Sequence, residues 1–397
     1  MMSAECGQRK MLARSLLTLR PVRGAARPGG LLTVQQQQRA LATSAATRDE
    51  FMATFPSVVD GVLEDCRRFD LPDSTVAWLD HLVKYTVPGG KLNRGLVVTR
   101  GLEALAGGKP VEGRALYEAQ VLGWCVEFLQ AAFLVADDIM DSSVVRRGQP
   151  CYYKLPQVGL VAVNDALLLE SFVYRILKRE FREHPAYVEI FELFQEIIFC
   201  TELGQLLDTT APARSRAEVE ERFTPDYYRK IVHHKTADYS FFLPVACSTV
   251  LHGGVGESTT GELRALCREM GEYFQARDDY LDCFGDPAVI GKVGTDIEQR
   301  KISWCAVSAL SAASAAERDF LSDLFVVPDD DQRPSAEQVA EVKALYRSLK
   351  VPEEWETYED ERVEAINSGI KAMGKGEGAA LVPALEFLLA KIHKRTK

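Results

Sequence analysis

The sequence lacks the features that mark a disulfide-bonded, zinc-binding or membrane-spanning protein. Its nine cysteines are scattered without a CxxC pair, which favours buried thiols in a reducing compartment. Its six histidines include one adjacent pair, His233 and His234, whose spacing is not that of a metal site. Glu127 and Gln130 interrupt the most apolar stretch, so no apolar run reaches the roughly 18 residues of a membrane span. These absences predict a protein with no membrane span.

Glycine and proline are also sparse, at 28 and 17 of 397 residues, and no segment of any length alternates as a strand does. Long segments instead carry apolar residues at helical spacing. Short breaks separate them at 87–91, 209–216, 252–261 and 327–334, and Ser335 followed by Gln338 has the form of a capping box. The helical spacing predicts an all-α protein. A content of 47% hydrophobic residues is enough to form the core of one large domain.

Acidic side chains are almost absent from residues 1–48, where Glu5 stands alone. The same segment is rich in Ala, Leu, Ser and Thr, and holds eight basic residues: Arg9, Lys10, Arg14, Arg20, Arg23, Arg27, Arg39 and Arg48. This composition is typical of a mitochondrial transit peptide, with a disordered basic tail as the alternative. We therefore expect a folded domain over 49–397 and a location in the mitochondrial matrix. An internal start at Met52 would give a cytosolic form.

The rest of the chain is strongly acidic. Residues 49–397 hold 39 basic and 56 acidic side chains, a net charge of about −17. So negative a body argues against nucleic acid as a partner.

Two aspartate triplets recur 141 residues apart, DDIMD at 137–141 and DDYLD at 278–282. Each follows an apolar helical stretch, and the first and last aspartate of each share a helix face. One triplet alone suits a solvated helix end. Two copies predict helices that face each other across a cavity, where only multivalent cations make so many carboxylates tolerable. The six carboxylates are Asp137, Asp138, Asp141, Asp278, Asp279 and Asp282.

Carboxylate sites without His or Cys favour hard cations, of which magnesium is the commonest. Magnesium is usually completed by substrate phosphates, so we expect a phosphate or diphosphate ligand. Basic side chains follow both triplets: Arg146, Arg147, Lys292, Arg300 and Lys301. A second basic group in PGGKLNRG, with Lys91, Asn93 and Arg94, predicts a second anionic ligand that is held without metal.

Five segments together resemble the farnesyl diphosphate synthases, which belong to the trans-isoprenyl diphosphate synthases. They are GGKLNRG, FLVADDIMDSSVVRRGQP, GQLLD, KTADYSF and FQARDDYLDCFGDPAVIGKVGTDIE, and the likeness covers roughly residues 50–397. The resemblance implies the isoprenoid synthase fold, a bundle of mainly antiparallel helices around a central cavity, usually as a homodimer. It also implies condensation of dimethylallyl and geranyl diphosphate with isopentenyl diphosphate, which yields farnesyl diphosphate and pyrophosphate.

The resemblance also implies roles for individual residues. Direct ligands of three magnesium ions are implied at Asp137, Asp141 and Asp278, with support from Asp138, Asp279 and Asp282. The allylic diphosphate would be held by Arg146, Lys235, Lys292 and Lys301. Isopentenyl diphosphate would be held by Lys91, Asn93, Arg94, Gln130, Arg147 and Arg395. Thr236 and Gln275 would stabilise the allylic cation with their dipoles, and the departing diphosphate would take the proton.

Three positions depart from the family pattern. Farnesyl-making animal enzymes usually carry two aromatics at the cavity floor, where this chain has Ala132 and Phe133. The missing ring leaves a geranylgeranyl product as an alternative, unless Phe133 or a neighbour closes the floor; we expect the fifteen-carbon product. Arg277 replaces a common Gln, and would either pair with an aspartate or point at solvent. Asp238 stands at an aromatic position.

Two other functions compete with the synthase. A terpene cyclase would share the fold and one aspartate motif but needs no isopentenyl site, and the retained Lys91, Asn93, Arg94 and Arg147 argue against it. A catalytically silent subunit would be free to lose aspartates, yet both triplets are intact.

Overall fold

The computed structural model describes residues 48–286, 289, 294–330 and 332–393, and within them helices make up nearly all of the regular structure. In chain order the elements are α3 (Arg48–Arg67), α4 (Asp73–Thr86), α5 (Asn93–Leu105), α6 (Gly113–Met140), β1 (Val145–Arg146), β2 (Gln149–Pro150), η1 (Tyr152–Lys154), η2 (Gly159–Val161), α7 (Ala162–Phe181), α8 (Tyr187–Thr210), α9 (Arg216–Arg222), α10 (Pro225–Val232), η3 (His233–Phe242), α11 (Leu243–His252), α12 (Glu257–Phe284), α14 (Trp304–Ala312), α15 (Ala315–Phe325), α16 (Ala336–Ser348), α17 (Val351–Met373), η4 (Glu377–Leu381) and α18 (Val382–Ile392). The predicted all-α class is confirmed.

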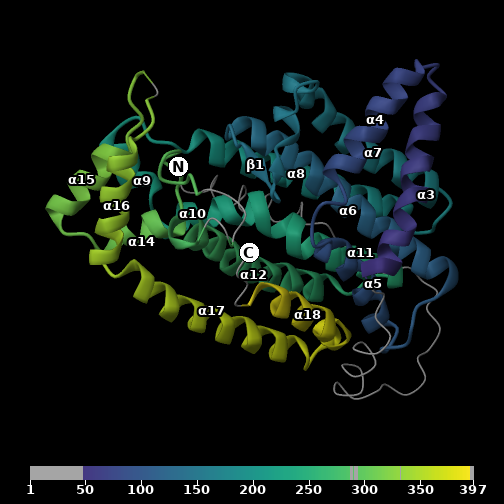
Figure 1. Cartoon of the computed structure of the whole chain (residues 1–397). Coiled ribbons are helices and arrows are strands. Elements are labelled where there is room, and N and C mark those ends of the chain that lie inside the picture. The colour runs from purple at the N-terminus through teal and green to yellow at the C-terminus, as the bar shows by residue number, and fades with distance from the viewer. Residues whose placement is uncertain (1–47, 287–288, 290–293, 331, 394–397) are drawn as a thin grey trace, which may run out of the picture.

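Helix α6 lies inside the bundle (Figure 1), and every residue from Ala119 to Ala132 is buried. A helix buried on all sides must be apolar on nearly all sides, and this is why its sequence shows no single apolar stripe. Helices α3, α5, α7 and α11 pack around it. Among the described residues α6 is the one helix long and apolar enough to cross a membrane, but 83% of its most apolar window is buried within the protein.

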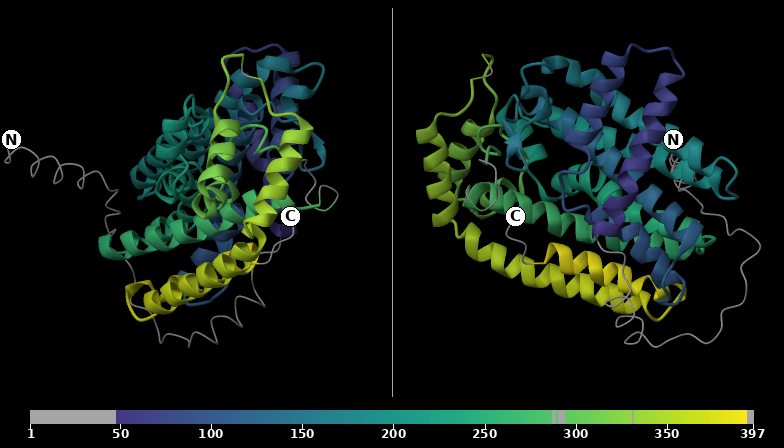
Figure 2. Two further views of the ribbon diagram at one scale, coloured as in Figure 1. Left: turned by 90° about the vertical axis from the view of Figure 1, so that its left-hand side faces the viewer. Right: turned by 45° about the vertical axis from the view of Figure 1, so that its right-hand side comes forward.

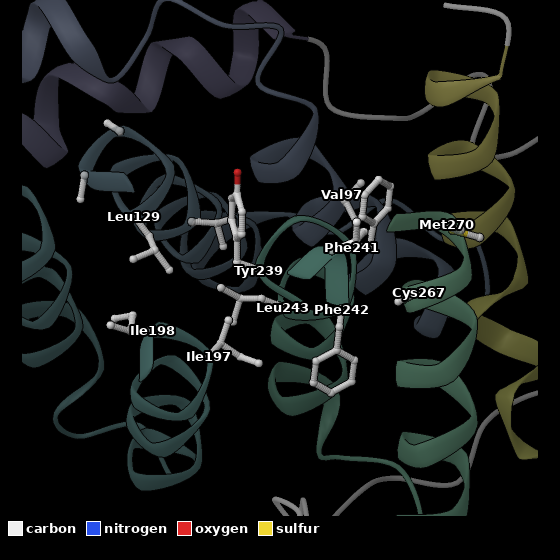
Figure 3. Packing of buried hydrophobic residues seen from close by; sticks show 14 of the residues in the cluster. Val97, Leu129, Ile197, Ile198, Tyr239, Phe241, Phe242, Leu243, Cys267 and Met270 are labelled. Atoms are coloured by element: carbon white, nitrogen blue, oxygen red, sulfur yellow. The ribbon is translucent and has the colours of Figure 1, made fainter. Parts of the chain in front are cut away.

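Helix α12 packs against both α17 and the π-helix η3. Figures 1 and 2 show α17 running alongside α12, and α18 lies beside the C-terminal part of α17. Figure 3 shows Tyr239, Phe241 and Phe242 of η3 among apolar side chains of α6, α8 and α12. The stretch 233–242 therefore packs between α8 and α12, and its Tyr239 also meets Phe133 of α6.

The sequence predictions of local structure are largely confirmed. Ser335 and Gln338 form the predicted capping box at the start of α16. The predicted break at 252–261 is shorter in the structure, because α12 already begins at Glu257. The predicted transit peptide falls on residues 1–47, which lie outside the described residues, and on Arg48, which opens α3.

Candidate active site

The first aspartate triplet lies at the C-terminal end of α6, where Asp141 is the C-cap. Helix carbonyls already give this end a partial negative charge, so three carboxylates here need counterions. Arg146 of β1 supplies one: its Nε and Nη2 donate to Asp138 Oδ1 at 2.8 and 2.7 Å, and Nη2 donates to Asp137 Oδ2 at 3.3 Å. The hairpin after α6 thus returns an arginine to the carboxylates that precede it.

Two lysines link the first triplet to a fourth aspartate, Asp208 of α8. Lys235 Nζ donates to Asp137 Oδ1 at 3.0 Å and to Asp208 Oδ2 at 2.7 Å. Lys301 Nζ donates to Asp141 Oδ1 at 2.8 Å and to the same Asp208 oxygen at 2.7 Å. Three acids and two lysines therefore form one partly buried network, in which charge-assisted hydrogen bonds offset the loss of hydration.

The charges in this network move the acid pKa values in opposite directions. Burial raises the pKa of the Asp208 carboxyl, but Lys235 and Lys301 outweigh burial and hold this pKa far below its ordinary value. The pKa of Asp137 is also lowered, because Lys235 and Arg146 outweigh burial. Burial and the charge of Asp137 raise the pKa of Asp141 against the opposing effect of Lys301. Asp208 and Asp137 therefore keep their negative charge to lower pH than an ordinary aspartate, whereas Asp141 loses its charge more readily.

The second triplet lies near the end of α12, and two of its members support neighbouring elements. Asp279 accepts from Gln275 Nε2 at 2.9 Å, from the Tyr228 hydroxyl at 2.9 Å and from the Trp304 backbone N–H at 2.8 Å. Burial raises the pKa of the Asp279 carboxyl to about 7. Asp282 accepts from the Asp296 backbone N–H at 3.1 Å. Asp279 and Asp282 thus hold neighbouring elements in place, and Asp278 is half-buried on α12.

The segment after α12 reaches back to the first triplet. Gln299 Nε2 donates to the Asp141 backbone carbonyl at 3.0 Å, and Lys301 follows it into the network. Arg300, between them, turns the other way: its φ is +53°, and it donates to the Leu324 and Gln332 carbonyls at 2.8 and 2.9 Å. Lys301 thus belongs to the site, while Arg300 fixes the path of the chain.

A second basic group forms around Arg94 at the start of α5. Arg94 Nη2 donates to Ser240 Oγ at 2.8 Å, and its guanidinium lies over the Tyr239 ring, 5.2 Å from the centroid. The Gln130 amide oxygen accepts from Arg94 Nη1 at 2.8 Å, and its nitrogen donates to Glu127 Oε2 at 3.0 Å. Arg94 and Gln130, which the sequence assigned to one ligand, therefore lie together.

The other members of this group flank Arg94. Asn93 opens α5 and is half-buried, and Lys91 is exposed. Arg147 lies along the glycine pair before Lys91, where a Cβ on Gly90 would come within 2.8 Å of its Nη2. Leu92 and Arg147 both have positive φ, +54° and +56°. Such backbone strain in non-glycine residues often accompanies functional sites.

A cavity of about 240 Å³ opens beside the first triplet, between the end of α4, α6 and the β1–β2 hairpin. Asp138, Arg146 and Arg147 line its polar side, and Leu134 and Val135 line its apolar side. The cavity therefore borders residues from both predicted diphosphate sites.

The polar and apolar residues assigned to the reacting carbons lie near one another. Thr236 Oγ1 donates to Gln275 Oε1 at 3.0 Å, which joins η3 to α12. Phe133 meets Tyr239 edge to face, with 5.4 Å between the ring centroids, and Ala132 is buried beside it on α6. Phe133 lies one helical turn before Asp137, as expected for a floor residue. Lys292 and Arg395, also assigned to the site, lie outside the described residues.

Sequence reasoning assigned no role to four residues that the structure brings into the site. Asp208 joins the two lysines, Gln205 Nε2 donates to Asp137 Oδ1 at 3.2 Å, Gln299 reaches Asp141 and Ser240 receives Arg94. The segment GQLLD, residues 204–208, was a signal for two of them. Its Gln205 and Asp208 stand three apart and so share a face of α8.

The departures at Arg277 and Asp238 have defined partners. Arg277 pairs with Glu359 of α17, and its guanidinium lies 5.6 Å from the Trp355 ring centroid. Asp238 is fully buried and pairs with Arg264 and Arg268 of α12. Arg277 therefore joins α12 to α17, and Asp238 joins η3 to α12.

The donor set of the first triplet fits a hard divalent cation. It offers only oxygen, and Asp137 and Asp141 lie on one helix face. Within the described residues no three acidic, histidine or cysteine side chains are already grouped as a metal centre. The carboxylates are instead held by lysines, so a bound cation would exchange places with Lys235 and Lys301.

Comparison with known proteins agrees with this geometry. A family model described as polyprenyl synthetase matches residues 76–346. The chain is 42% identical to farnesyl pyrophosphate synthase of Panax ginseng, over 86% of this chain and 96% of that one. It is 40% identical to the enzyme of that name from Saccharomyces cerevisiae, over 88% and 98%. The solved structure of T. brucei farnesyl diphosphate synthase complexed with risedronate superposes with a TM-score of 0.79 at 34% identity, over 88% of this chain and 99% of that chain.

Proposed function

The chain belongs to the polyprenyl synthetase family and has farnesyl diphosphate synthase activity, and from this premise we propose how its residues divide the reaction. The observation that carries the proposal is the presence of two separate cationic groups. Lys235, Lys301 and Arg146 converge on the first aspartate triplet, and Arg94 with Gln130 forms the second group. Two cationic groups suit two diphosphate substrates, whereas a terpene cyclase ionises one.

The first group binds the allylic diphosphate and stabilises the charge that it gains as its C–O bond breaks. Lys235 and Lys301 are partly buried, so their charge acts on the leaving diphosphate with little screening. Magnesium, three ions per site bound through Asp137, Asp141 and Asp278, would add Lewis-acid stabilisation of that charge. Thr236 and Gln275 present dipoles, not nucleophiles, to the carbocation.

The second group orients isopentenyl diphosphate for attack on that cation. Arg94, Arg147 and Lys91 hold its diphosphate, and Gln130 fixes Arg94. Because the reacting carbons must meet in a geometry close to the transition state, this positioning supplies much of the rate. The released diphosphate accepts the proton, so no protein base is required.

Product analysis tests the proposal. Residues 48–397 are supplied with magnesium, isopentenyl diphosphate and geranyl diphosphate, and the products are dephosphorylated and identified by mass. Farnesol is the expected product. Geranylgeraniol as the main product would indicate that Ala132 opens the floor, and a cyclic hydrocarbon would contradict the synthase assignment.

A thermal-shift experiment tests the metal sites without using activity. Magnesium and pyrophosphate together should raise the melting temperature more than the two separate shifts combined, because each completes the other's site. In Asp137→Asn this additional shift should be lost. An undiminished shift in D137N would remove Asp137 from the metal ligands.

We also propose that the chain acts as a homodimer through α7 and α8. Three large apolar side chains, Phe199, Leu203 and Leu206, lie on one face of α8 and are 58%, 45% and 59% exposed. Exposed apolar residues of η2 and of the start of α7 add to this surface: Leu160 and Val161 in η2, and Val163 and Leu167 in α7. A contiguous apolar surface of this kind favours a protein interface, and a second copy offers a matching one.

Sedimentation velocity tests the dimer. The unmodified protein should sediment as a dimer and Leu203→Glu as a monomer. Glu202→Gln, at an exposed neighbouring position, is the matched control. A monomeric unmodified protein would contradict this surface as the interface.

For localisation we propose import into mitochondria through residues 1–48. A chain that starts at Met52 would lack Phe51, which is fully buried and stacks on Trp124 with 4.4 Å between ring centroids. Loss of this ring should cost about 3–5 kcal/mol, so the shorter cytosolic form should be less stable. A fluorescent fusion of residues 1–48 that stays cytosolic would contradict the import proposal.

A further inference from the structure

The π-helix η3 presents site residues at two places one turn apart. Lys235 and Thr236 contact Asp208 and Gln275 at one place, and Tyr239 and Ser240 contact Arg94 at the other. The intervening residue Asp238 contacts none of these groups. It is fully buried on the side of η3 that packs against α12.

Asp238 receives two arginines that are one turn apart on α12. Arg264 Nη2 and Nε donate to Asp238 Oδ2 at 2.6 and 3.2 Å. Arg268 donates through Nε to Oδ1 at 2.9 Å and through Nη2 to Oδ2 at 2.8 Å, and Cys200 of α8 lies 3.6 Å from Oδ2. We call Asp238, Arg264 and Arg268 the α12 clamp. Its geometry is specific because both carboxylate oxygens are occupied.

Other contacts hold η3 against α12 along its length. His233 Nε2 contacts Glu272 Oε1, one turn before the clamp. Gly271 meets Ala237 so closely that a Cβ on the glycine would lie 2.3 Å from the alanine Cβ. Close backbone approach and buried ion pairs therefore leave η3 little freedom to slide or rotate.

A π-helix needs such restraint because its backbone has a ready alternative. π-turns are rare and often occur at functional sites, and reversion to the α-helical winding would rotate the downstream residues relative to the upstream ones. In η3 that rotation would separate Lys235 and Thr236 from the positions of Tyr239 and Ser240. The clamp is attached between these pairs.

We propose that the α12 clamp is a positioning device for the reaction, which fixes the winding of η3 so that both diphosphate sites keep their mutual geometry. The buried Asp238 charge is paired with the two arginines, and removal of the charge leaves those arginines without this partner. The inference rests on the proposed function, because Lys235 and Arg94 matter through the two substrates. Asp238 itself touches no reacting atom.

Kinetics of Asp238→Asn and Arg268→Lys test the proposal. Arg268→Lys keeps the positive charge at position 268 and leaves the Asp238–Arg264 pair intact. It therefore still tests the proposal if the D238N protein does not fold. Both variants should lose kcat on the order of 10- to 100-fold, while KM changes less, when measured far below their melting temperatures. Displaced catalytic groups reduce kcat, whereas a merely structural role would lower the melting temperature and leave the kcat of the folded fraction unchanged.

Glu269→Gln is the matched control. Glu269 is the neighbour of Arg268 but pairs with Arg362 of α17 at 3.2 Å, so its loss should leave kcat unchanged. If the unmodified protein makes farnesyl diphosphate and both clamp variants keep full kcat, the clamp inference is overturned and the function stands. If the unmodified protein makes none, the proposed function itself fails.

Discussion

At the scale of single residues, Asp208 balances the charge of the site. It accepts from Lys235 and Lys301 at 2.7 Å each, and these lysines come from segments 66 positions apart. The segment GQLLD marks the face of α8 that carries Asp208, but its two lysine partners reach it only after η3 and the segment behind α12 have met. The aspartate triplets were predictable because their repetition is visible along the chain.

Asp208→Asn should reduce kcat for farnesyl diphosphate formation on the order of 10-fold or more. The amide leaves two lysines without their shared negative partner, so their side chains move from the allylic diphosphate site. Steady-state kinetics with geranyl and isopentenyl diphosphate measure the effect. Asp319→Asn, which removes an exposed partner of Arg216, should be silent, and full activity of D208N would contradict the role of Asp208.

Phe133→Ala should lengthen the product. The Phe133 ring lies one turn before Asp137 and against Tyr239, so its removal opens space in the direction of the growing chain. Mass analysis of the released alcohols should then show geranylgeraniol beside farnesol. Ala132→Phe should still give farnesol, because it narrows the same region. Farnesol alone from F133A would place the floor elsewhere.

At the scale of elements, η3 is the part of the fold that the sequence does not predict. Its residues resemble an ordinary helix, because a π-turn differs by one residue in winding and carries no periodic signal of its own. Tertiary contacts select it: Gly204 of α8 passes so close that a Cβ there would lie 2.2 Å from the Lys235 backbone nitrogen. The glycine in GQLLD is therefore a packing requirement.

Gly204→Ala should displace Lys235 and destabilise the protein by about 1–3 kcal/mol, because the added methyl group meets backbone that cannot rotate away. The free energy of unfolding, measured with urea, and kcat should both decrease in this variant. Gly261→Ala is the contrasting variant: nothing lies within 4 Å of its Cβ position on α12, so it should stabilise by about 0.5–1 kcal/mol. Equal stabilities of G204A and the parent would contradict the close approach of Gly204 in α8 to the Lys235 backbone in η3.

Helix type and the location of the charged groups followed from sequence, whereas their partners did not. The Arg94 group was predicted from PGGKLNRG, and Arg94 lies with Gln130 as expected. Arg277 was expected near an aspartate or solvent, but its Glu359 partner is 82 residues away on α17. Spacing along the chain predicts which residues share one face of a helix. Which residues that face contacts is known only from the packing of the folded protein.

At the scale of the whole molecule, burial of charge links stability to pH. Glu103 of α5 is 2% exposed, and one of its carboxylate oxygens has no hydrogen-bond partner among the described residues. Burial raises the pKa of this carboxyl to about 7, from an ordinary value of 4.5. The folded protein thus keeps a proton that the unfolded chain loses at lower pH.

The stability that Glu103 contributes should be complete below pH 4.5 and should fall as the pH rises through about 7. The pKa difference corresponds to a loss on the order of 3 kcal/mol. Glu103→Gln removes this dependence of the free energy of unfolding on pH. The variant should therefore be more stable than the parent at pH 8 and similar or less stable at pH 5. Urea unfolding of both proteins at each pH measures the difference. Parallel pH curves would contradict burial of the charge, and exposed Glu364→Gln serves as the reference.

The lysines that bridge the three aspartates make the site behave as an ion exchanger. Before any ligand arrives, its fixed charges already compensate one another within the chain. A divalent cation alone would have to displace the lysines from the aspartates. A diphosphate alone would have to displace the aspartates from the lysines. When both enter together, each takes the partners that the other displaces. We therefore expect strong reciprocal coupling between the two ligands, and a protein that stays folded when chelators deprive it of metal.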